Sequence, residues 1–563
     1  MNLQKFVTDA INEKLAKMPA LAGADLSAVA VEVPKVREFG DFAVNAAMVL
    51  ARPLKQNPRV IAEIILPEIS ALAFVADASV AGPGFINIRL KDDFVLESIN
   101  QKSEIRNQKS LTIDLDYGGY NVGKDLHVGH FRTTVVGDTF NRIAKYLGHK
   151  TKSYNHLGDW GRPMGLIIAW IMEYGMPNSA AELNKMYPLS TARAKDDEKW
   201  MERAQKITAE LQSGNAEYRK IYDAFMKITL DQMDEILQRL NIMPFDMNMG
   251  ERGLSEYVPE LQKILESRGL LTESDGALVI NVKQDDDTAP MPPVMFRYSS
   301  GANGYHAADL TAIYYRDKTD KPDAIYYFVD NRQTLHFTQI FRAAKLAKIT
   351  GADLWNAGYG TINGPDGKPL KTRDGGAASL SDILNMVDDA ARKRVKEAGK
   401  NLPDDAVKMI ALAALKFNDL MHDLKSDYIL DPDIVTQFEG RTGPYILYTA
   451  VRLGSIIKRV GAHDCAPGVP RTPLHPDERN LLLTLLDFDR IVQTAFDKRA
   501  TDLLANYAYD LCQDINAFYH NCPILRDDVG EATRAHRLAI VHAALTVLSN
   551  AIDLMGLKIP DEM

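Results

Sequence analysis

The sequence contains few cysteines and no long apolar segment. Its 563 residues include three cysteines, Cys465, Cys512 and Cys522, which form no CxxC pair and follow no regular spacing. A disulfide framework and a cysteine-based zinc site are therefore not expected. No stretch reaches the roughly 18 apolar residues typical of a membrane-spanning helix, and the charged, amphipathic N-terminus lacks the apolar core of a signal peptide. We expect a cytoplasmic protein that is not associated with a membrane.

The chain also lacks an excess of basic residues. Lys and Arg number 66 against 75 Asp and Glu, which gives a net charge of −9. On that count alone, nucleic acid is not the first partner to expect, because proteins that bind it commonly carry a basic surface. The 46% of hydrophobic and 25% of charged residues are typical of an ordinary globular protein. The length predicts roughly three or four domains.

The pattern along the chain predicts an α/β protein that ends in a helical bundle. Residues 1–108 have the pattern of a small α/β domain. Residues 109–376 contain a strand-loop-helix-strand unit, which predicts a Rossmann-type parallel sheet, and charged helical segments near 178–255 interrupt it. Residues 377–436 are expected to be a helical connection, and 437–563 an all-α bundle.

Three later segments have β character, namely 276–282, 294–298 and 324–330. They follow the charged helical segments, which predicts that the interrupted fold resumes there. A helix is expected to begin near Thr334, and almost everything from Leu380 onward has a helical pattern.

The most informative segment is NVGKDLHVGHFRTT, residues 121–134. It places His127 and His130 at the expected strand-to-helix junction, with Gly129 between them. A residue without a side chain lets a flat base approach the backbone, and imidazoles at a helix N-terminus can donate hydrogen bonds to phosphate oxygens. A metal-binding or structural pair of histidines is the alternative, although this HxxH lacks the glutamate of a zincin.

A second segment, GKPLKTRDGG at 367–376, is rich in glycine and basic residues. Lys368, Lys371 and Arg373 in such a loop could hold phosphates and neutralise charge as pyrophosphate leaves. By itself, the loop is better explained as an exposed basic turn.

Taken together, the segments resemble one family. HVGH resembles the HIGH motif of class I aminoacyl-tRNA synthetases, and GKPLKTRDGG is similar to the divergent KMSKS loop of arginyl-tRNA synthetases, where the two motifs flank one nucleotide pocket. Further matches lie from the first domain to the last residues, in FGDFAVNAA, AGPGFIN, NHLGDWG, YYFVDNRQTLHFTQ, SDYILDPDIVTQFEGRTGPYILYTAVR and LMGLKIPDEM.

The resemblance implies a reaction and its machinery. L-arginine and ATP, with Mg²⁺ on the nucleotide, would form an arginyl adenylate, and the arginyl group would pass to tRNA(Arg), which the family usually binds before it activates arginine. His127, His130 and Lys371 would meet charge that develops on the phosphates. The expected ATP-binding residues are Lys124, His127, Gly129, His130, Lys368, Lys371 and Arg373.

Arginine recognition by carboxylates is also implied. A guanidinium requires planar carboxylate or amide acceptors, which discriminate it from lysine. By resemblance, Asp116, Tyr305, Asp309 and Gln333 hold the substrate arginine, and Asn121 binds its amino-acid head group. A helix N-terminal carboxylate at Asp309 and a strand-end turn at Asp116 are the alternatives.

The sequence departs from the family around this expected pocket. Gly118-Gly119-Tyr120 replaces the usual Ser/Ala-Pro before the asparagine, Arg162-Pro163-Met164-Gly165 follows GDWG, and His306-Ala307-Ala308 precedes Asp309. These changes leave two alternatives open. The first is a paralogue that adenylates arginine or a related amino acid for a resistance or biosynthetic pathway, and the second is a tRNA-binding protein without catalysis.

The resemblance also assigns tRNA contacts to both ends of the chain. The N-terminal domain would contact the tRNA elbow, and the bundle would bind the anticodon, with Tyr445, Tyr448 and Arg452 as candidates. A core-facing stripe is an equal alternative for these tyrosines. Residues 437–563 hold 13 Lys and Arg against 16 Asp and Glu, so a local positive track would have to meet the tRNA, and binding should weaken with salt. A monomer is expected.

Overall fold

The structure is a computed structural model that describes residues 2–34, 37–99, 109–370, 378–460 and 473–563. The chain divides into two compact units. We call them the sheet unit, which is Lys109–Pro444 with Leu554–Lys558, and the bundle unit, which is Met1–Gln108, Tyr445–Asp553 and Ile559–Met563.

A five-stranded parallel sheet forms the centre of the sheet unit, with the order β12-β11-β5-β6-β7. The strands are β5 (Thr112–Asp116), β6 (Lys150–Leu157), β7 (Met247–Gly250), β11 (Ala324–Asp330) and β12 (Asp353–Tyr359). Helix α5 (Val128–Tyr146) connects β5 to β6, and α13 (Thr334–Leu346) connects β11 to β12. The predicted Rossmann-type fold class is confirmed.

The direction of strand order reverses between β5 and β11. From β5 the chain first proceeds to β6 and β7 on one side, and later adds β11 and β12 on the other side. In open α/β sheets, ligands bind outside the carboxyl ends of the strands at such a reversal. The topology therefore marks the ends of β5 and β11, at Asp116 and Asp330, as the expected location of a site.

Two of the three later strand segments do not continue this sheet. β9 (Ala277–Ile280) and β10 (Val294–Arg297) pair with each other and with β8 (Leu271–Ser274) in a separate antiparallel sheet. The β character expected at 276–282 and 294–298 is present, but these strands form a sheet of their own. Asp275 and Gly276 join β8 to β9 with positive φ values of 51° and 76°, and such a two-residue hairpin turn imposes antiparallel pairing.

Helices α7 (Ala180–Asp196), α8 (Glu198–Ser213) and α9 (Ala216–Arg239) occupy most of the range expected to be a helical insertion. The end of that range differs from the expectation, because β7 adds an edge strand to the parallel sheet and α10 (Glu251–Leu254) follows it directly. The strand is four residues long, and its sequence, MNMG, contains no β-branched residue that would have indicated β structure.

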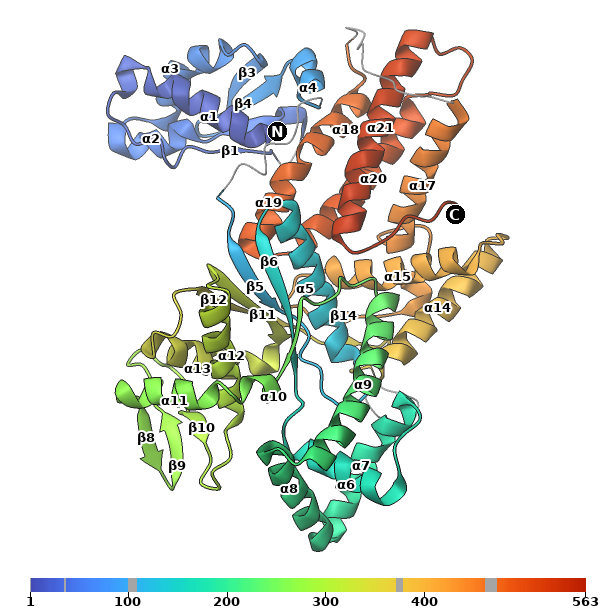
Figure 1. Ribbon diagram of the computed structural model, residues 1–563. Coiled ribbons are helices and arrows are strands. Elements are labelled where there is room, and N and C mark those ends of the chain that lie inside the picture. The colour runs from blue at the N-terminus through green and yellow to red at the C-terminus, as the bar shows by residue number, and fades with distance from the viewer. Residues whose placement is uncertain (1, 35–36, 100–108, 371–377, 461–472) are drawn as a thin grey trace. The chain divides into compact units, whose positions relative to one another are not determined.

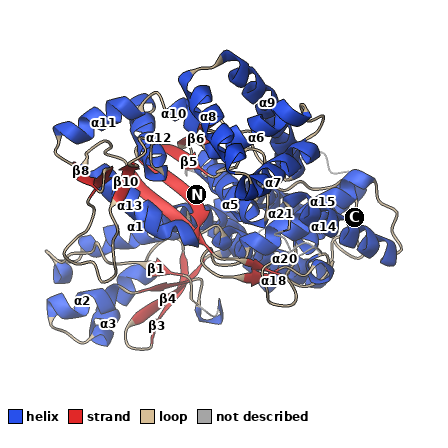
Figure 2. Cartoon of the chain, turned by 90° about the horizontal axis from the view of Figure 1, so that it is seen from below, coloured by secondary structure: helices blue, strands red, loops and turns tan. Residues whose placement is uncertain are grey.

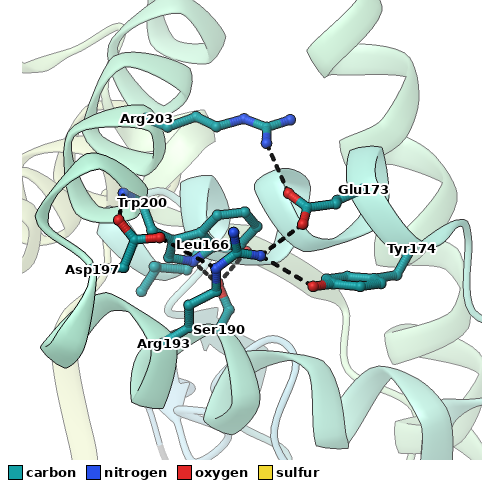
Figure 3. Close-up of polar contacts among 8 residues, drawn as sticks. All are labelled: Leu166, Glu173, Tyr174, Ser190, Arg193, Asp197, Trp200 and Arg203. Carbon is teal, nitrogen blue, oxygen red and sulfur yellow. Dashed lines mark hydrogen bonds and ion pairs between the residues drawn. The ribbon is translucent and has the colours of Figure 1, made fainter.

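Figure 3 shows how the first helices of the insertion are held together. The guanidinium of Arg193 in α7 lies 3.9 Å above the ring of Trp200 in α8. It also donates to Glu173 at 2.7 Å, at the end of α6 (Arg162–Tyr174). The Trp200 indole N–H donates to Ser190 Oγ at 2.9 Å, and Ser190 donates to Leu166 O at 2.8 Å. Cation–π and charge-assisted contacts therefore join three helices.

An apolar core forms between the antiparallel sheet, strand β11 and three helices. Helix α11 (Val258–Ser267), α12 (Tyr305–Thr319) and α13 pack there against β9, β10 and β11. Its fully buried side chains include Leu261, Ile280, Phe296, Leu310 and Ile340. This packing fixes the N-terminal turns of α12 and α13, where several of the predicted site residues lie.

The helices after the sheet are α14 (Leu380–Glu397), α15 (Asp404–Leu420) and α16 (Pro432–Val435), and β13 (Ile362–Asn363) pairs in parallel with β14 (Tyr428–Ile429). Helix α5 is tied to this region by Arg132, which is 1% exposed. Its Nε lies 2.9 Å from Asp419, and Nη1 donates to the carbonyls of Gly360 and Ser426.

The bundle unit begins with a small α/β domain. An antiparallel sheet of order β1-β2-β4-β3 packs with three helices and a short fourth one. The elements are α1 (Leu3–Ala16), 3-10 helix η1 (Pro19–Leu21), β1 (Val31–Glu32), 3-10 helix η2 (Arg37–Phe39), β2 (Phe42–Val44), α2 (Ala46–Leu54), α3 (Pro58–Ser70), β3 (Val75–Ala81), β4 (Phe85–Leu90) and α4 (Asp92–Ile99).

The C-terminal part is built of helices, as Figures 1 and 2 show. They are α17 (Gly443–Val460), α18 (Pro476–Leu486), α19 (Phe488–Lys498), α20 (Asp502–Asn521) and α21 (Glu531–Leu554). Among the described residues, α21 is the one helix long and apolar enough to cross a membrane by length and composition. This is weak evidence, since 44% of its most apolar window is already buried within the protein.

Arg479 on α18 connects the bundle helices to the N-terminal α/β domain. Its guanidinium lies 2.5 Å from Asp41, donates to Leu90 O at 2.9 Å, and also pairs with Asp92. The Arg479 side chain is 6% exposed, so this is a buried charge network with several partners. The two ends of the chain therefore form one unit, an association that the sequence did not indicate.

Candidate active site

The two histidines of HVGH form the N-terminal cap of α5. His127 is the N-cap residue, and its Nδ1 accepts a hydrogen bond from the Gly129 N–H at 3.1 Å. His130 Nδ1 accepts in turn from the His127 N–H at 3.1 Å. This is a capping box made of two imidazoles, and the rings stack with centroids 3.9 Å apart.

The cap determines which ring nitrogens carry protons. Because both Nδ1 atoms accept hydrogen bonds, each neutral imidazole carries its proton on Nε2. Burial lowers the pKa of His130 to about 3, and the nearby His127 and Lys124 charges act in the same direction. Burial, together with Arg332 and Lys124, also lowers the pKa of His127. At neutral pH, each ring therefore offers one Nε2–H donor.

A cavity opens at the strand-order reversal, and both histidines line it. The predicted site residues that line it are Asp116, Asn121, His127, Gly129, His130, Tyr305, Asp309 and Gln333. Residues expected to bind phosphate and residues expected to bind arginine thus share one cavity.

Asp116, at the end of β5, is paired with a guanidinium of the protein itself. Arg316 Nη2 lies 2.5 Å from Asp116 Oδ2, and the Arg316 side chain is 2% exposed. The rings of Tyr154 and Tyr327 lie 4.3 and 5.2 Å from Arg316 Cζ. One oxygen of Asp116 is therefore engaged before any substrate arrives, a contact that the sequence did not reveal.

Asp309 and Tyr305 lie in the first turns of α12. Asp309 is 8% exposed, and its Oδ2 lies 2.6 Å from His336 Nε2. Although burial acts to raise the pKa of Asp309, the hydrogen bond from His336 and the charge of His156 lower it overall. Burial, with Asp309, Glu251 and Asp116, raises the pKa of the Tyr305 phenol well above its usual value, so that phenol keeps its proton.

Several lining residues were not predicted from the sequence, among them Glu251 and His156. Burial raises the pKa of Glu251, and the carboxylates of Asp159 and Asp309 add to this effect while His156 opposes it. A cavity that gathers the carboxyl groups of Asp116, Glu251 and Asp309 is suited to a cation. Recognising β7 as a strand would have placed Glu251, the next residue, at the carboxyl edge.

Lys124 and Lys368, two further residues expected to bind phosphate, are not among the residues that line the cavity. Lys124 Nζ lies 5.0 Å above the Tyr187 ring of α7. Lys368 is exposed, and its N–H donates to Asp366 at 3.1 Å. Lys371 and Arg373 lie outside the described residues.

The described residues next to the basic loop are nevertheless bonded to the HVGH segment. Beyond the loop, Ala378 O accepts from Val128 N at 3.2 Å, and Leu380 N donates to Leu126 O at 2.7 Å. Before it, the Tyr359 hydroxyl donates to Gly129 O at 3.1 Å. The segments that flank residues 371–377 are thus bonded to the HVGH segment, although the two lie far apart in sequence.

The departures at 118–120 have a structural reason. A Cβ at Gly118 would lie 2.1 Å from Asn155 Oδ1, so any side chain there would force a shift. Tyr120 is 1% exposed, its hydroxyl lies 2.6 Å from Thr134 Oγ1, and its edge faces the His130 ring with centroids 5.4 Å apart. The tyrosine therefore contributes to the burial of His130.

The other two departures differ in their relation to the cavity. Residues 162–165 begin α6, and Gly165 approaches α8 so closely that a Cβ would lie 2.1 Å from Ala204 O. They are not among the lining residues. The His306 ring lies at a tilt against the ring of His336, with centroids 4.6 Å apart, and His336 is bonded to Asp309.

The three candidate tRNA-binding residues lie on α17 of the bundle unit. The Tyr445 hydroxyl accepts from Gln513 at 2.8 Å and from Asn516 at 2.6 Å. Arg452 stacks 3.7 Å from the Tyr519 ring centroid. Tyr448 is 37% exposed. Tyr445 is half-buried and bonded to α20, whereas Tyr448 presents part of its surface to solvent.

A Rossmann-type sheet with a HIGH-like helix cap at its switch point and a helical C-terminal bundle defines a class I aminoacyl-tRNA synthetase. Comparisons with known proteins agree. Residues 93–432 match the family described as tRNA synthetases class I (R), catalytic domain. Residues 3–90 match the arginyl tRNA synthetase N terminal domain, and 446–563 match the DALR anticodon binding domain.

The particular family follows from full-length relatives. An arginine–tRNA ligase of Hyphomonas neptunium is 36% identical over 98% of this chain and 100% of its own length. One of Alkaliphilus oremlandii is 34% identical over 100% of this chain and 99% of its own. The arginyl-tRNA synthetase of Thermus thermophilus has the same fold, with a TM-score of 0.85 at 24% identity and full coverage of both chains. The chain belongs to the arginyl-tRNA synthetase family, which confirms the resemblance.

Proposed function

We propose that the cavity at the carboxyl edge of the parallel sheet is where this chain activates L-arginine with ATP. The chain is an aminoacyl-tRNA synthetase that attaches arginine to tRNA, as its full-length relatives do by name. The observation that supports this location is the meeting of two kinds of group in one cavity. Nε2–H donors from the α5 cap and carboxylates suited to a guanidinium line the same cavity.

In the first step, a carboxylate oxygen of arginine attacks the α-phosphorus of ATP, and the bond to the leaving pyrophosphate breaks. The enzyme forms no covalent bond, so its contribution is positioning and charge stabilisation. His127 and His130 donate through Nε2–H to phosphate oxygens, and Gly129 lets the adenine approach the backbone. Lys371, together with Lys368 and Arg373, neutralises the charge of the departing pyrophosphate. Lys124 assists from the α7 side.

The arginine side uses the carboxyl-rich wall of the cavity. Asp309 and Glu251 accept hydrogen bonds from the guanidinium, and Tyr305 packs against its stem. Gln333 and Asn121 bind the polar head group. Asp116, already paired with Arg316, contributes its remaining oxygen.

Mg²⁺ enters with ATP. It is commonly held by nucleotide phosphates and waters with few protein ligands, so a dedicated protein cage is not needed. Its role is to neutralise phosphate charge.

The tRNA contacts are distributed over the chain. The N-terminal domain, residues 1–108, contacts the elbow of tRNA(Arg), and the bundle, residues 437–563, binds the anticodon around Tyr445, Tyr448 and Arg452. Residues 109–376 form the catalytic domain, and 377–436 connect it to the bundle. The enzyme acts as a monomer in the cytoplasm.

Pyrophosphate exchange with a panel of amino acids, in the presence and absence of tRNA(Arg), tests the proposal. Exchange is expected with arginine, and it should depend on the tRNA. Exchange driven by another amino acid, or no exchange at all while the protein is folded, would contradict it.

A further inference from the structure

The carboxylate of Asp309 is held by a histidine from a different helix. His336, in the first turn of α13, places Nε2 2.6 Å from Asp309 Oδ2. The two side chains are 13% and 11% exposed. Since an ionised carboxylate can only accept, Nε2 of His336 is the donor in this contact.

His336 is itself held in place by two neighbouring rings. The Tyr305 and His306 rings both pack against it, with centroids 4.8 and 4.6 Å from the His336 centroid. The Phe337 ring adds an edge-on contact at 5.3 Å. An imidazole packed in this way has little freedom to rotate, so the direction of its N–H is set by the fold.

We propose that His336 is a positioning residue that orients the carboxylate of Asp309 for the guanidinium of the substrate. This inference rests on the proposed function, because it takes Asp309 as a guanidinium acceptor. With Oδ2 bonded to His336, Oδ1 is the oxygen left for a ligand in the cavity, and the plane of the carboxylate is fixed.

A fixed plane matters more for arginine than for lysine. A guanidinium is planar and donates along fixed directions, whereas an ammonium is a compact charge with rotating donors. Releasing Asp309 should therefore weaken arginine binding strongly and lysine binding weakly. His336 would contribute to the choice of amino acid without contacting the reacting atoms.

The test compares His336→Leu, which removes the donor, with His336→Gln, whose side-chain amide can supply an N–H near the position of Nε2. Aminoacylation of tRNA(Arg) is measured at varied arginine. For His336→Leu we expect KM for arginine to rise about 10- to 100-fold, the effect of losing one hydrogen bond to a charged group, with kcat changed by less than about threefold. His336→Gln should restore most of the affinity.

A second loss variant, His336→Asn, guards against misfolding, because its amide is polar but too short to reach Asp309. It should behave like His336→Leu. Thr338→Val is the matched control, since Thr338 lies on the same helix and donates to Thr334 O at 2.8 Å; its KM should be unchanged. Thermal unfolding of each variant confirms that it is folded.

The outcomes separate the inference from the proposed function. If the unmodified chain fails to charge tRNA(Arg) with arginine, the proposed function is wrong. If it charges tRNA, but the Leu and Asn variants keep KM for arginine, or lose kcat at constant KM, the inference about His336 is wrong. The same holds if glutamine gives no rescue, or if the arginine-to-lysine preference in pyrophosphate exchange does not fall.

Discussion

The two sides of the cavity are built in different ways. On the nucleotide side, His127 and His130 are joined by a hydrogen bond between residues three positions apart. On the arginine side, the Asp309–His336 bond spans 27 positions and the Asp116–Arg316 pair spans 200. The first arrangement is contained in one short motif, whereas the second exists only once distant elements have packed together.

A short sequence motif describes a site well only when the contacts of that site are local. A local cap sets the tautomer of two imidazoles as soon as the helix forms, because backbone donors at a helix N-terminus require acceptors. A carboxylate that binds a guanidinium needs a fixed orientation. In this protein, side chains from distant helices provide it. Substitutions far away in the sequence should therefore affect amino-acid specificity more than they affect the reaction with ATP.

The largest effect is expected when the long-range pair on the arginine side is broken. Arg316→Met leaves the Asp116 carboxylate buried without its partner, which should lower the free energy of unfolding by about 3–5 kcal/mol. Urea unfolding measures this. Arg342→Met, which removes a less buried ion pair with Asp287, is the control and should lower the free energy of unfolding by clearly less. Equal losses in the two variants would contradict the distinction.

The nucleotide side should respond mainly in rate. His130→Ala is expected to lower adenylation at least about a hundredfold, the scale seen when one transition-state donor is removed. Pyrophosphate exchange in the presence of tRNA(Arg) is the measurement. His149→Ala is a matched control, since both histidines are 9% exposed, and it should keep a near-normal rate. A near-normal rate for His130→Ala would refute its assignment.

A side chain introduced at Gly118 tests the fit at the strand end. Gly118→Ser introduces a Cβ only 2.1 Å from Asn155 Oδ1, so the loop must shift, at a cost of about 1–3 kcal/mol in unfolding free energy. Thermal unfolding and KM for arginine should both be affected. Gly119→Ser is not an adequate control because Gly119 has a φ of +70°. Gly351→Ser, where a Cβ meets nothing within 4 Å, should leave KM unchanged.

The smallest effect concerns the pH dependence of stability, which depends on the buried carboxyl group of Asp114. Burial raises the pKa of Asp114 from 3.8 to about 7, with Arg316 opposing and Asp320 adding to the shift. The folded state then binds more protons than the unfolded state between about pH 4 and 7, so Asp114 lowers stability as pH rises through that window. Asp114→Asn should add about 1–2 kcal/mol of unfolding free energy at pH 8.

The same variant at acidic pH provides the reference. At pH 4.5, where the native Asp114 side chain is largely protonated, the substitution should change stability little. Urea unfolding at the two pH values gives both numbers. A gain of equal size at pH 4.5 and pH 8 would show that titration of Asp114 is not its cause.

Several elements of the fold were readable from sequence because their signals are local. The strand at 324–330 and the helix starting at Thr334 occur as predicted, since a buried β-branched run and a helical repeat each report on neighbouring residues. The strands at 277–280 and 294–297 form a separate sheet that was not predicted, since strand character does not specify the pairing partner. Yet the Asp275-Gly276 turn was a local sign of a hairpin.

The amino-acid sequence by itself determined the family, the class of fold and the two phosphate-directed motifs, because each depends on residues close together in the chain. Only the tertiary structure decided that Arg316 forms an ion pair with Asp116, that Glu251 lines the cavity, and that His336 forms a hydrogen bond with Asp309. The physical reason is that a buried charge needs a partner within a few ångströms, and packing, not sequence distance, selects that partner.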